Sequence, residues 1–223
     1  MEKPILATTI KDVIIDRNSW VDAHYLWFDE REKELSEKGL STGPIDEWKT
    51  LLRKNPEEEK ETYFKYVDEV MKLLYPDLSN SKRTEIARES YFDSVLEFIK
   101  QNQDKINHDF IEYLESLKGK YRIAIITTNT WSALEKILEV SYINKDLFDL
   151  IEVSKLEEKD DKTIVFERFI EKHGKPNFYI GSSEKTIKYC KEKKIKYIST
   201  NFYTNNNLPD SVANIEELKE VIG

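Results

Sequence analysis

The stretch from residue 11 to residue 20 reads Lys11-Asp12-Val13-Ile14-Ile15-Asp16-Arg17-Asn18-Ser19-Trp20, and in it an apolar run leads directly into a carboxylate. β-Branched residues in succession are typical of a buried strand. We therefore predict a strand over residues 13–16 that places Asp16 at its carboxyl end. Open α/β sheets bind their ligands at that end of their strands, and a carboxylate there can act as a nucleophile.

The region that follows is helical in pattern. From about residue 21 to residue 117, apolar residues recur at spacings of three and four, as at Tyr63, Tyr66 and Val70. Proline interrupts this pattern at three places, because proline cannot continue a helix. The pattern predicts four or five helices and no strand in this region.

After residue 120, short β-rich runs alternate with amphipathic segments. The predicted strands cover residues 122–126, 150–153, 177–180 and 196–199, and the predicted helices cover 132–138, 163–172, 184–193 and 215–221. Such alternation indicates βαβ units and a parallel sheet. We expect a Rossmann-like α/β core domain made of residues 1–20 and 106–223, with an α-helical cap domain (residues 21–105) inserted after the first strand.

Composition restricts the protein class. The 223 residues carry a formal net charge of -8, which disfavours a nucleic-acid partner. No apolar run is long enough for a membrane span, and the single Cys190 fits a reducing cytoplasm, so we expect a cytoplasmic protein with no membrane partner. Lys and Glu dominate the charged residues and Gln is scarce, a composition associated with thermophilic sources.

The order of these segments resembles that of haloacid dehalogenase-like (HAD) hydrolases, a superfamily of mostly phosphatases with an aspartate nucleophile. In that family an apolar strand precedes D-x-D-G-T, a second strand ends in Ser or Thr, a third motif supplies a lysine, and a fourth reads apolar-G-D-x-x-x-D. The stretches at residues 11–20, 122–129, 155–162 and 179–186 are similar to these motifs in the same order. The resemblance covers nearly the whole chain and implies a HAD-like fold with a helical cap.

The resemblance also implies roles for individual residues. Asp16 matches the nucleophile, and either Lys159 or Lys162 matches the catalytic lysine. The expected binding residues for an anionic group are Asn18, Thr127, Thr128, Asn129, Ser182 and Ser183. Zinc is not expected, because the three histidines have no ligand spacing.

Several positions depart from the family pattern. Asn18 stands where the second Asp serves as general acid and base, and an amide cannot exchange a proton near neutral pH. Ser182 and Thr186 replace the acids of the fourth motif. Because Mg²⁺ favours carboxylate ligands, we expect no tight magnesium site, although the family commonly uses this ion.

Three hypotheses for function follow. The first is a HAD-like hydrolase that acts on a small anionic substrate (a phosphate ester, an acyl phosphate or a haloacid) through Asp16. The second is a catalytically inactive HAD-fold protein that binds an anionic metabolite or a protein partner. The third is a magnesium phosphatase in which Asp160, Asp161 or Glu184 replaces the missing ligands. The substrate and the oligomeric state stay open.

Overall fold

The computed structural model describes residues 3–54, 59–155, 161–203 and 210–222. The chain forms two compact units, one made of Met1–Arg17 with Ile99–Gly223 and the other of Asn18–Phe98. The predicted boundaries were residues 20/21 and 105/106, so the α/β unit takes more of the chain after the helical insertion than we predicted.

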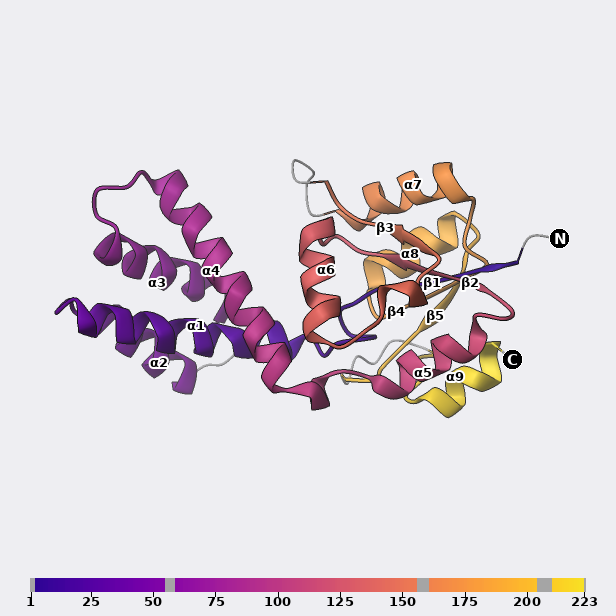
Figure 1. Cartoon of the computed structure of the whole chain (residues 1–223), viewed down its shortest axis with the longest axis horizontal. Helices are drawn as coiled ribbons and strands as arrows, with labels where there is room; N and C mark the ends of the chain where they lie inside the picture. Colours follow the sequence, from indigo (N-terminus) through magenta and orange to yellow (C-terminus); the bar gives the residue numbers. More distant parts are fainter. Residues whose placement is uncertain (1–2, 55–58, 156–160, 204–209, 223) are drawn as a thin grey trace. The chain divides into compact units, whose positions relative to one another are not determined.

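The α/β unit is built on a parallel five-stranded sheet (Figure 1). Its strands are β1 (Ile5–Thr8), β2 (Arg122–Ile126), β3 (Leu150–Glu152), β4 (Phe178–Gly181) and β5 (Lys196–Ser199), in the spatial order β3-β2-β1-β4-β5. All neighbouring strands are parallel. The Rossmann-like α/β class predicted from the sequence is confirmed, and the last four predicted strands lie within one residue of those observed.

The first strand, however, was predicted wrongly. The central strand is β1, which pairs with β2 on one side and β4 on the other. The predicted strand over residues 13–16 lies in a buried loop, where the backbone N–H groups of Ile14 and Ile15 both donate to the Ile10 carbonyl at 3.0 Å. The runs at residues 5–8 and 13–16 are both buried. The sequence pattern indicates that a run is buried, but it does not indicate which of the two pairs with neighbouring strands.

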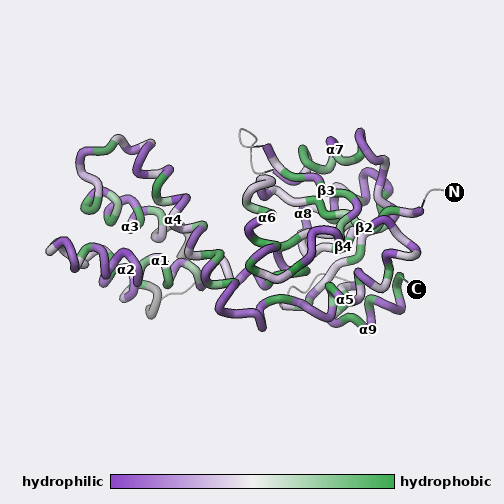
Figure 2. Tube along the Cα trace, in the orientation of Figure 1, coloured by the Kyte–Doolittle hydropathy of each residue, from purple (hydrophilic) through white to green (hydrophobic). Residues whose placement is uncertain are grey.

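Helices cover both faces of the sheet, because the strands of a parallel sheet are apolar on both faces and must be buried on both. They are α5 (His108–Leu117), α6 (Trp131–Val140), α7 (Lys162–His173), α8 (Glu184–Glu192) and α9 (Ile215–Ile222). In Figure 1, α7 and α8 lie on one side of the sheet, and α5 and α9 lie on the other. Figure 2 shows hydrophobic residues concentrated along the strands between these helices.

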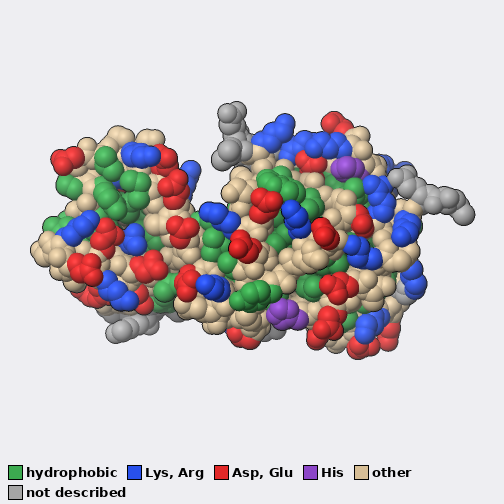
Figure 3. Space-filling model, in the orientation of Figure 1, with side chains coloured by type: hydrophobic (Ala, Val, Ile, Leu, Met, Phe, Trp, Pro, Cys, Tyr) green, Lys and Arg blue, Asp and Glu red, His purple; other side chains and the backbone are tan. Residues whose placement is uncertain are grey.

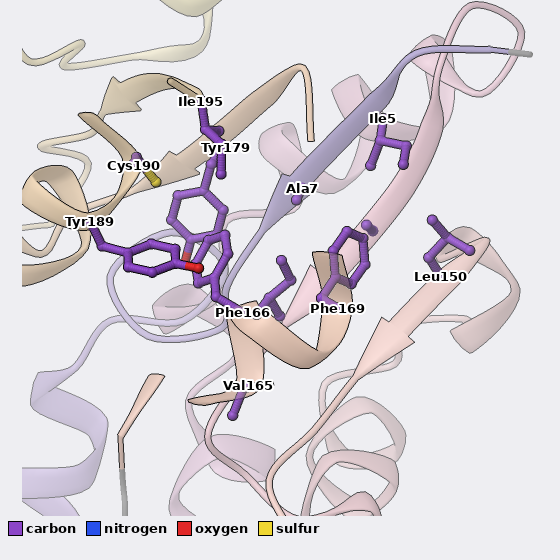
Figure 4. Packing of buried hydrophobic residues seen from close by; sticks show 12 residues of the cluster. Ile5, Ala7, Leu150, Val165, Phe166, Phe169, Tyr179, Tyr189, Cys190 and Ile195 are labelled. Carbon is purple, nitrogen blue, oxygen red and sulfur yellow. The ribbon is translucent and has the colours of Figure 1, made fainter. Parts of the chain in front are cut away.

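The core beneath α7 and α8 is rich in aromatic side chains (Figure 4). Phe166 of α7 packs edge to face against Tyr179 of β4, with ring centroids 4.8 Å apart. Cys190 is buried in the same cluster, and burial raises the pKa of its thiol to about 12. This cysteine therefore packs as a small apolar side chain.

The helical unit contains α1 (Asn18–Glu37), α2 (Gly43–Lys54), α3 (Glu59–Leu74) and most of α4 (Asn80–Gln101). Its core is also aromatic, and Phe28 stacks on Trp48 with ring centroids 4.0 Å apart. None of the helices among the described residues is long and apolar enough to cross a membrane. The face shown in Figure 3 carries Lys and Arg interspersed with Asp and Glu.

Candidate functional site

A pocket of about 120 Å³ lies at the carboxyl ends of the central strands, entirely within the α/β unit. Its walls come from the segments that follow β1, β2 and β4 and from the first turns of α7 and α8. The lining residues are Thr9, Lys11, Asp12, Arg17, Thr127, Thr128, Asn129, Lys162, Tyr179, Ser182, Ser183 and Thr186. The strand order reverses direction at β1 and β4, and open α/β sheets bind ligands at such a switch point.

Lys162 crosses the base of this pocket from the first turn of α7. Its Nζ donates to Thr9 Oγ1 at 2.6 Å and lies 5.4 Å from the centre of the Tyr179 ring. The helix start is fixed by Asp161, whose carboxylate accepts from the Thr163 N–H at 3.0 Å. The ammonium group is therefore held where the first strand ends.

Tyr179 forms the buried floor beneath this contact. It is 1% exposed, and burial raises the pKa of its phenol well above the ordinary value. The phenol makes no hydrogen bond of ordinary geometry, although the Thr9 side chain is near enough to lower its pKa slightly against that effect. Tyr179 is thus a neutral group at every physiological pH.

Asp12 is a buried carboxylate in this pocket, and its oxygens are already engaged. Arg17 Nε lies 2.7 Å from Asp12 Oδ2, and the Arg17 backbone N–H donates to Oδ1 at 3.3 Å. Ser182 Oγ also donates to Oδ2, at 3.2 Å. The negative charge of this carboxylate is therefore compensated by a guanidinium, and both of its oxygens already have partners within the protein.

The backbone at Asp12 is left-handed, with φ of 63°. When β1 is taken as the first strand, the D-x-D-G-T pattern falls on Thr9-Ile10-Lys11-Asp12-Val13, so Asp12 occupies the glycine position. Glycine adopts positive φ without steric cost, whereas a residue with a Cβ loses stability in this conformation. Asp12 therefore has a backbone conformation that glycine would adopt more easily, and in this register Thr9 follows the strand directly.

This alignment predicts an order among variants that lack the Asp12 carboxylate. We expect Asp12→Gly to be about 1 kcal/mol more stable towards unfolding than Asp12→Ala, because alanine carries a Cβ in a left-handed conformation. Both variants lose the same ion pair, so their difference isolates the backbone term. Urea denaturation of the two proteins measures it, and an alanine variant as stable as the glycine variant would contradict the assignment.

Thr127 is positioned by the neighbouring strand and by its own loop. Its N–H donates to the Glu152 carbonyl at 3.1 Å, and its Oγ1 accepts from the Asn129 N–H at 3.2 Å and Asn129 Nδ2 at 3.0 Å. With its oxygen occupied as an acceptor, the hydroxyl proton is left to donate. A donor facing the pocket is suited to an anionic oxygen.

The structure brings together most of the residues that the sequence suggested for binding. Thr127, Thr128, Asn129, Ser182 and Ser183 line one pocket. Of the two candidate lysines, Lys162 lines it as well. Lys159 and Asp160 lie outside the described residues.

Other predicted residues lie elsewhere. Asp16 is buried, with 7% exposure, but it does not line the pocket, and its backbone N–H donates to the Lys105 carbonyl at 3.0 Å. Asn18 is the first residue of α1, in the helical unit. Asp161 caps α7, and the Thr163 backbone N–H lowers the pKa of its carboxyl to about 2. Glu184 begins α8.

Six lining residues were not among the predicted site residues, and two of these are Tyr179 and Thr186. The other four, Thr9, Lys11, Asp12 and Arg17, follow the first strand. The signal for them is the apolar run at residues 4–7, which is followed by two threonines rather than by an acid. A search for a strand that ends in aspartate passes over this run and stops at Asp16. The error in the first strand therefore produced the error in the first motif.

The residues of the pocket do not fit a magnesium ion. Among the lining residues that the structure describes, Asp12 is the single carboxylate and Lys11, Arg17 and Lys162 are cationic. Over the described ranges, no three His, Cys, Asp or Glu side chains are placed to hold a metal ion together. Mg²⁺ is held in proteins by carboxylates and substrate oxygens, and this donor set offers one carboxylate that is already paired with Arg17.

Comparison with known proteins identifies the fold. No protein-family model matches the sequence, and no curated protein matches it. Among solved structures, a HAD-superfamily hydrolase of subfamily IA from Geobacter sulfurreducens aligns with a TM-score of 0.62 at 16% identity, over 99% of this chain and 97% of that chain. A 2-haloacid dehalogenase from Pseudomonas syringae aligns with a TM-score of 0.58 at 17% identity, over 100% and 98%.

A HAD-hydrolase from Bacillus subtilis, described as bound to magnesium, aligns with a TM-score of 0.56 at 17% identity, over 100% of this chain and 99% of that chain. At these sequence identities the structural similarity establishes the fold only. Arguments about chemistry must therefore come from the residues of the pocket. Together with the parallel sheet and the helical insertion after its first strand, these alignments show that the chain has the haloacid dehalogenase-like fold.

Proposed function

We propose that the pocket binds the phosphoryl group of a small anionic metabolite and that it does so without forming an aspartyl intermediate. The observation that carries this proposal is the composition of the pocket wall. Of the lining residues within the described ranges, three are cationic and one is a carboxylate, and that carboxylate is paired with Arg17. The surplus of positive charge, together with several hydroxyl donors, favours a ligand with more than one negative charge.

The size of the pocket supports a small anionic group. Its volume of about 120 Å³ is below the ~300 Å³ typical of pockets that enclose a whole drug-sized ligand. Lys162 and Thr127 line the same pocket, and an ammonium and a hydroxyl are both donors suited to phosphoryl oxygens. The lining residues of the pocket are mostly polar or charged. We therefore expect the pocket to bind the anionic group of the ligand rather than its apolar part.

The same residues argue against hydrolysis through Asp16. A nucleophile must reach the reacting atom, and Asp16 is not among the pocket residues. The residue that directly follows the central strand is Thr9 and not an aspartate. Its hydroxyl oxygen accepts a hydrogen bond from Lys162 Nζ. Release of an alkoxide also requires a proton donor, and Lys11 holds the position that the alignment gives to the second Asp.

A second candidate function is hydrolysis with Asp12 as the nucleophile. It is favoured by one observation, namely that Asp12 is a carboxylate that does line the pocket, at 2% exposure. It requires Arg17 to release one carboxylate oxygen when substrate binds. Activity assays on single variants separate this candidate from binding alone.

The binding test uses inorganic phosphate as the probe and Lys162→Met as the variant. We expect the Kd for phosphate, measured by isothermal titration calorimetry, to rise at least about tenfold, since a hydrogen bond to a charged group contributes roughly 1.5–3 kcal/mol. Methionine keeps much of the apolar stem and removes the charge. Lys185→Met is the matched control, because Lys185 lies outside the pocket, is 69% exposed and pairs with Asp161.

The activity test uses acetyl phosphate, p-nitrophenyl phosphate and 2-chloropropionate, each with and without Mg²⁺. Binding without turnover is the expected result. Turnover that Asp16→Asn abolishes would restore the hydrolase predicted from the sequence, and turnover that Asp12→Asn abolishes would establish the second candidate. Absence of phosphate binding in the unchanged protein would overturn the proposal.

A further inference from the structure

The ion pair of Asp12 with Arg17 lies within the pocket and also involves Ser182. Asp12 is nearly fully buried in the loop after β1, and the guanidinium that neutralises it comes from the last residue before the helical unit. Ser182, at the end of β4, donates to the same carboxylate oxygen. Segments that follow two different strands therefore meet at the Asp12 carboxylate. The cation that pairs with this carboxylate is the Arg17 guanidinium.

Arg17 is paired with Asp12 through Nε, and about half of its side chain is exposed. Its Nε forms an ion pair with Asp12 Oδ2, its backbone N–H donates to Asp12 Oδ1, and its side chain is 52% exposed and lines the pocket. A guanidinium presents its N–H donors in a rigid plane that matches two oxygens of a phosphate or carboxylate. The ligand donors that we assign to Arg17 are therefore the two terminal nitrogens, since Nε is paired with Asp12.

We infer that Arg17, held by Asp12 and Ser182, supplies the positive charge that a divalent metal would otherwise supply, so that the pocket binds its anion without metal. The ligand part of this inference rests on the proposed function, whereas the exclusion of metal by Arg17 does not. The positive guanidinium occupies the one carboxylate that a metal ion requires. Lys11 and Lys162 in the same wall add repulsion against a divalent cation.

The first test measures the dependence of phosphate affinity on metal and on Arg17. Titrations of the full chain with inorganic phosphate in 5 mM Mg²⁺ and in EDTA should give the same Kd within about twofold, whereas Arg17→Met should raise Kd at least about tenfold. Arg17→Lys, which keeps the charge but loses the planar guanidinium, should fall between the two. Arg88→Met, which removes an arginine of the helical unit, should leave Kd unchanged.

The second test measures metal binding directly and needs no anion. Mn²⁺ serves as the probe, and electron paramagnetic resonance counts the bound ion in the unchanged protein, in Arg17→Met and in the double variant Arg17→Met with Asp12→Asn. We expect no site in the unchanged protein, a weak site in Arg17→Met because Asp12 and Ser182 lose their cation, and loss of that site in the double variant. Circular dichroism confirms that each variant is folded.

The outcomes separate this inference from the proposed function. A Mn²⁺ site in the unchanged protein that Asp12→Asn removes would overturn the inference, as would a phosphate affinity that Mg²⁺ raises tenfold or more. If phosphate binds neither with metal nor without it, the proposed function fails, and the Mn²⁺ measurement still decides whether Arg17 excludes a metal. A phosphate Kd that is the same in Arg17→Met and in the unchanged protein would also overturn the role of Arg17.

Discussion

Replacement of Glu152 by Gln should lower the free energy of unfolding by about 3 kcal/mol, because it removes a buried negative charge and leaves its cations uncompensated. Glu152 is 4% exposed at the end of β3. Its Oε1 accepts from Arg168 Nε at 2.5 Å, and its Oε2 lies 2.9 Å from Lys172 Nζ. Lys172 can turn to solvent, but the Arg168 side chain is only 15% exposed and stays in place.

Urea denaturation followed by far-UV circular dichroism measures this loss. The matched control is Glu216→Gln, which breaks the pair of Glu216 with Lys219 on the surface of α9, where Glu216 is 81% exposed. The control should change stability by less than about 0.5 kcal/mol, since exposed pairs contribute little. Equal effects of the two substitutions would show that burial of Glu152 does not set its contribution.

Phosphate binding gives a second readout for the Glu152 variant. Thr127 in the pocket donates to the carbonyl oxygen of Glu152, not to its carboxylate. The folded Glu152→Gln protein should therefore keep the phosphate affinity of the unchanged protein while its stability falls. This separation distinguishes a residue that holds the sheet and α7 together from one that contacts the ligand.

The sequence predicts the later strands well because their signals are local. Each predicted run from residue 122 onward is bounded by polar turns and separated by a helix-forming segment. Gly174 was also predictable, since a helix that ends in a left-handed residue favours glycine, and its φ is 83°. The family resemblance implied a HAD-like fold for these elements, and the alignment with solved structures confirms that fold.

The first strand could not be assigned by the same reasoning. The run at residues 5–8 and the run at residues 13–15 are both fully apolar or nearly so, and both are buried. What separates them is pairing with β2 and β4, whose residues lie more than a hundred positions away in the sequence. Pairing of this kind is nonlocal, so pattern alone assigned the strand to the run that ends in an acid.

Residues of the pocket were predicted from the sequence only where the strand that precedes them was predicted correctly. The residues after β2 and β4, such as Thr127 and Ser182, were predicted and line the pocket, because those strands were placed correctly. The residues after β1 were missed for the converse reason. The ion pair of Asp12 with Arg17 depends on a left-handed backbone at Asp12, and no local pattern of polar and apolar residues reports that conformation.

The largest effect of pH should come from His24 in the helical unit. Burial lowers the pKa of its imidazole from 6.5 to about 4 in the folded protein. The ring stacks on Tyr63 with centroids 3.7 Å apart and lies 4.8 Å from the Tyr91 ring. As the pH falls below 6.5, the unfolded chain binds a proton at His24 and the folded protein does not, so stability is lost until the pH reaches about 4.

The loss attributable to His24 between pH 7 and pH 4 should be about 3 kcal/mol, at 1.36 kcal/mol per pKa unit. Carboxylates titrate in the same range, so the test compares the unchanged protein with His24→Phe, which keeps an aromatic ring against Tyr63 and cannot be protonated. Tryptophan fluorescence is a suitable probe, because Trp27 and Trp48 lie in the core of the same unit. The difference in stability between the two proteins should shift in favour of His24→Phe as the pH falls, and a difference that stays constant with pH would mean that His24 is protonated equally in the folded and unfolded chains.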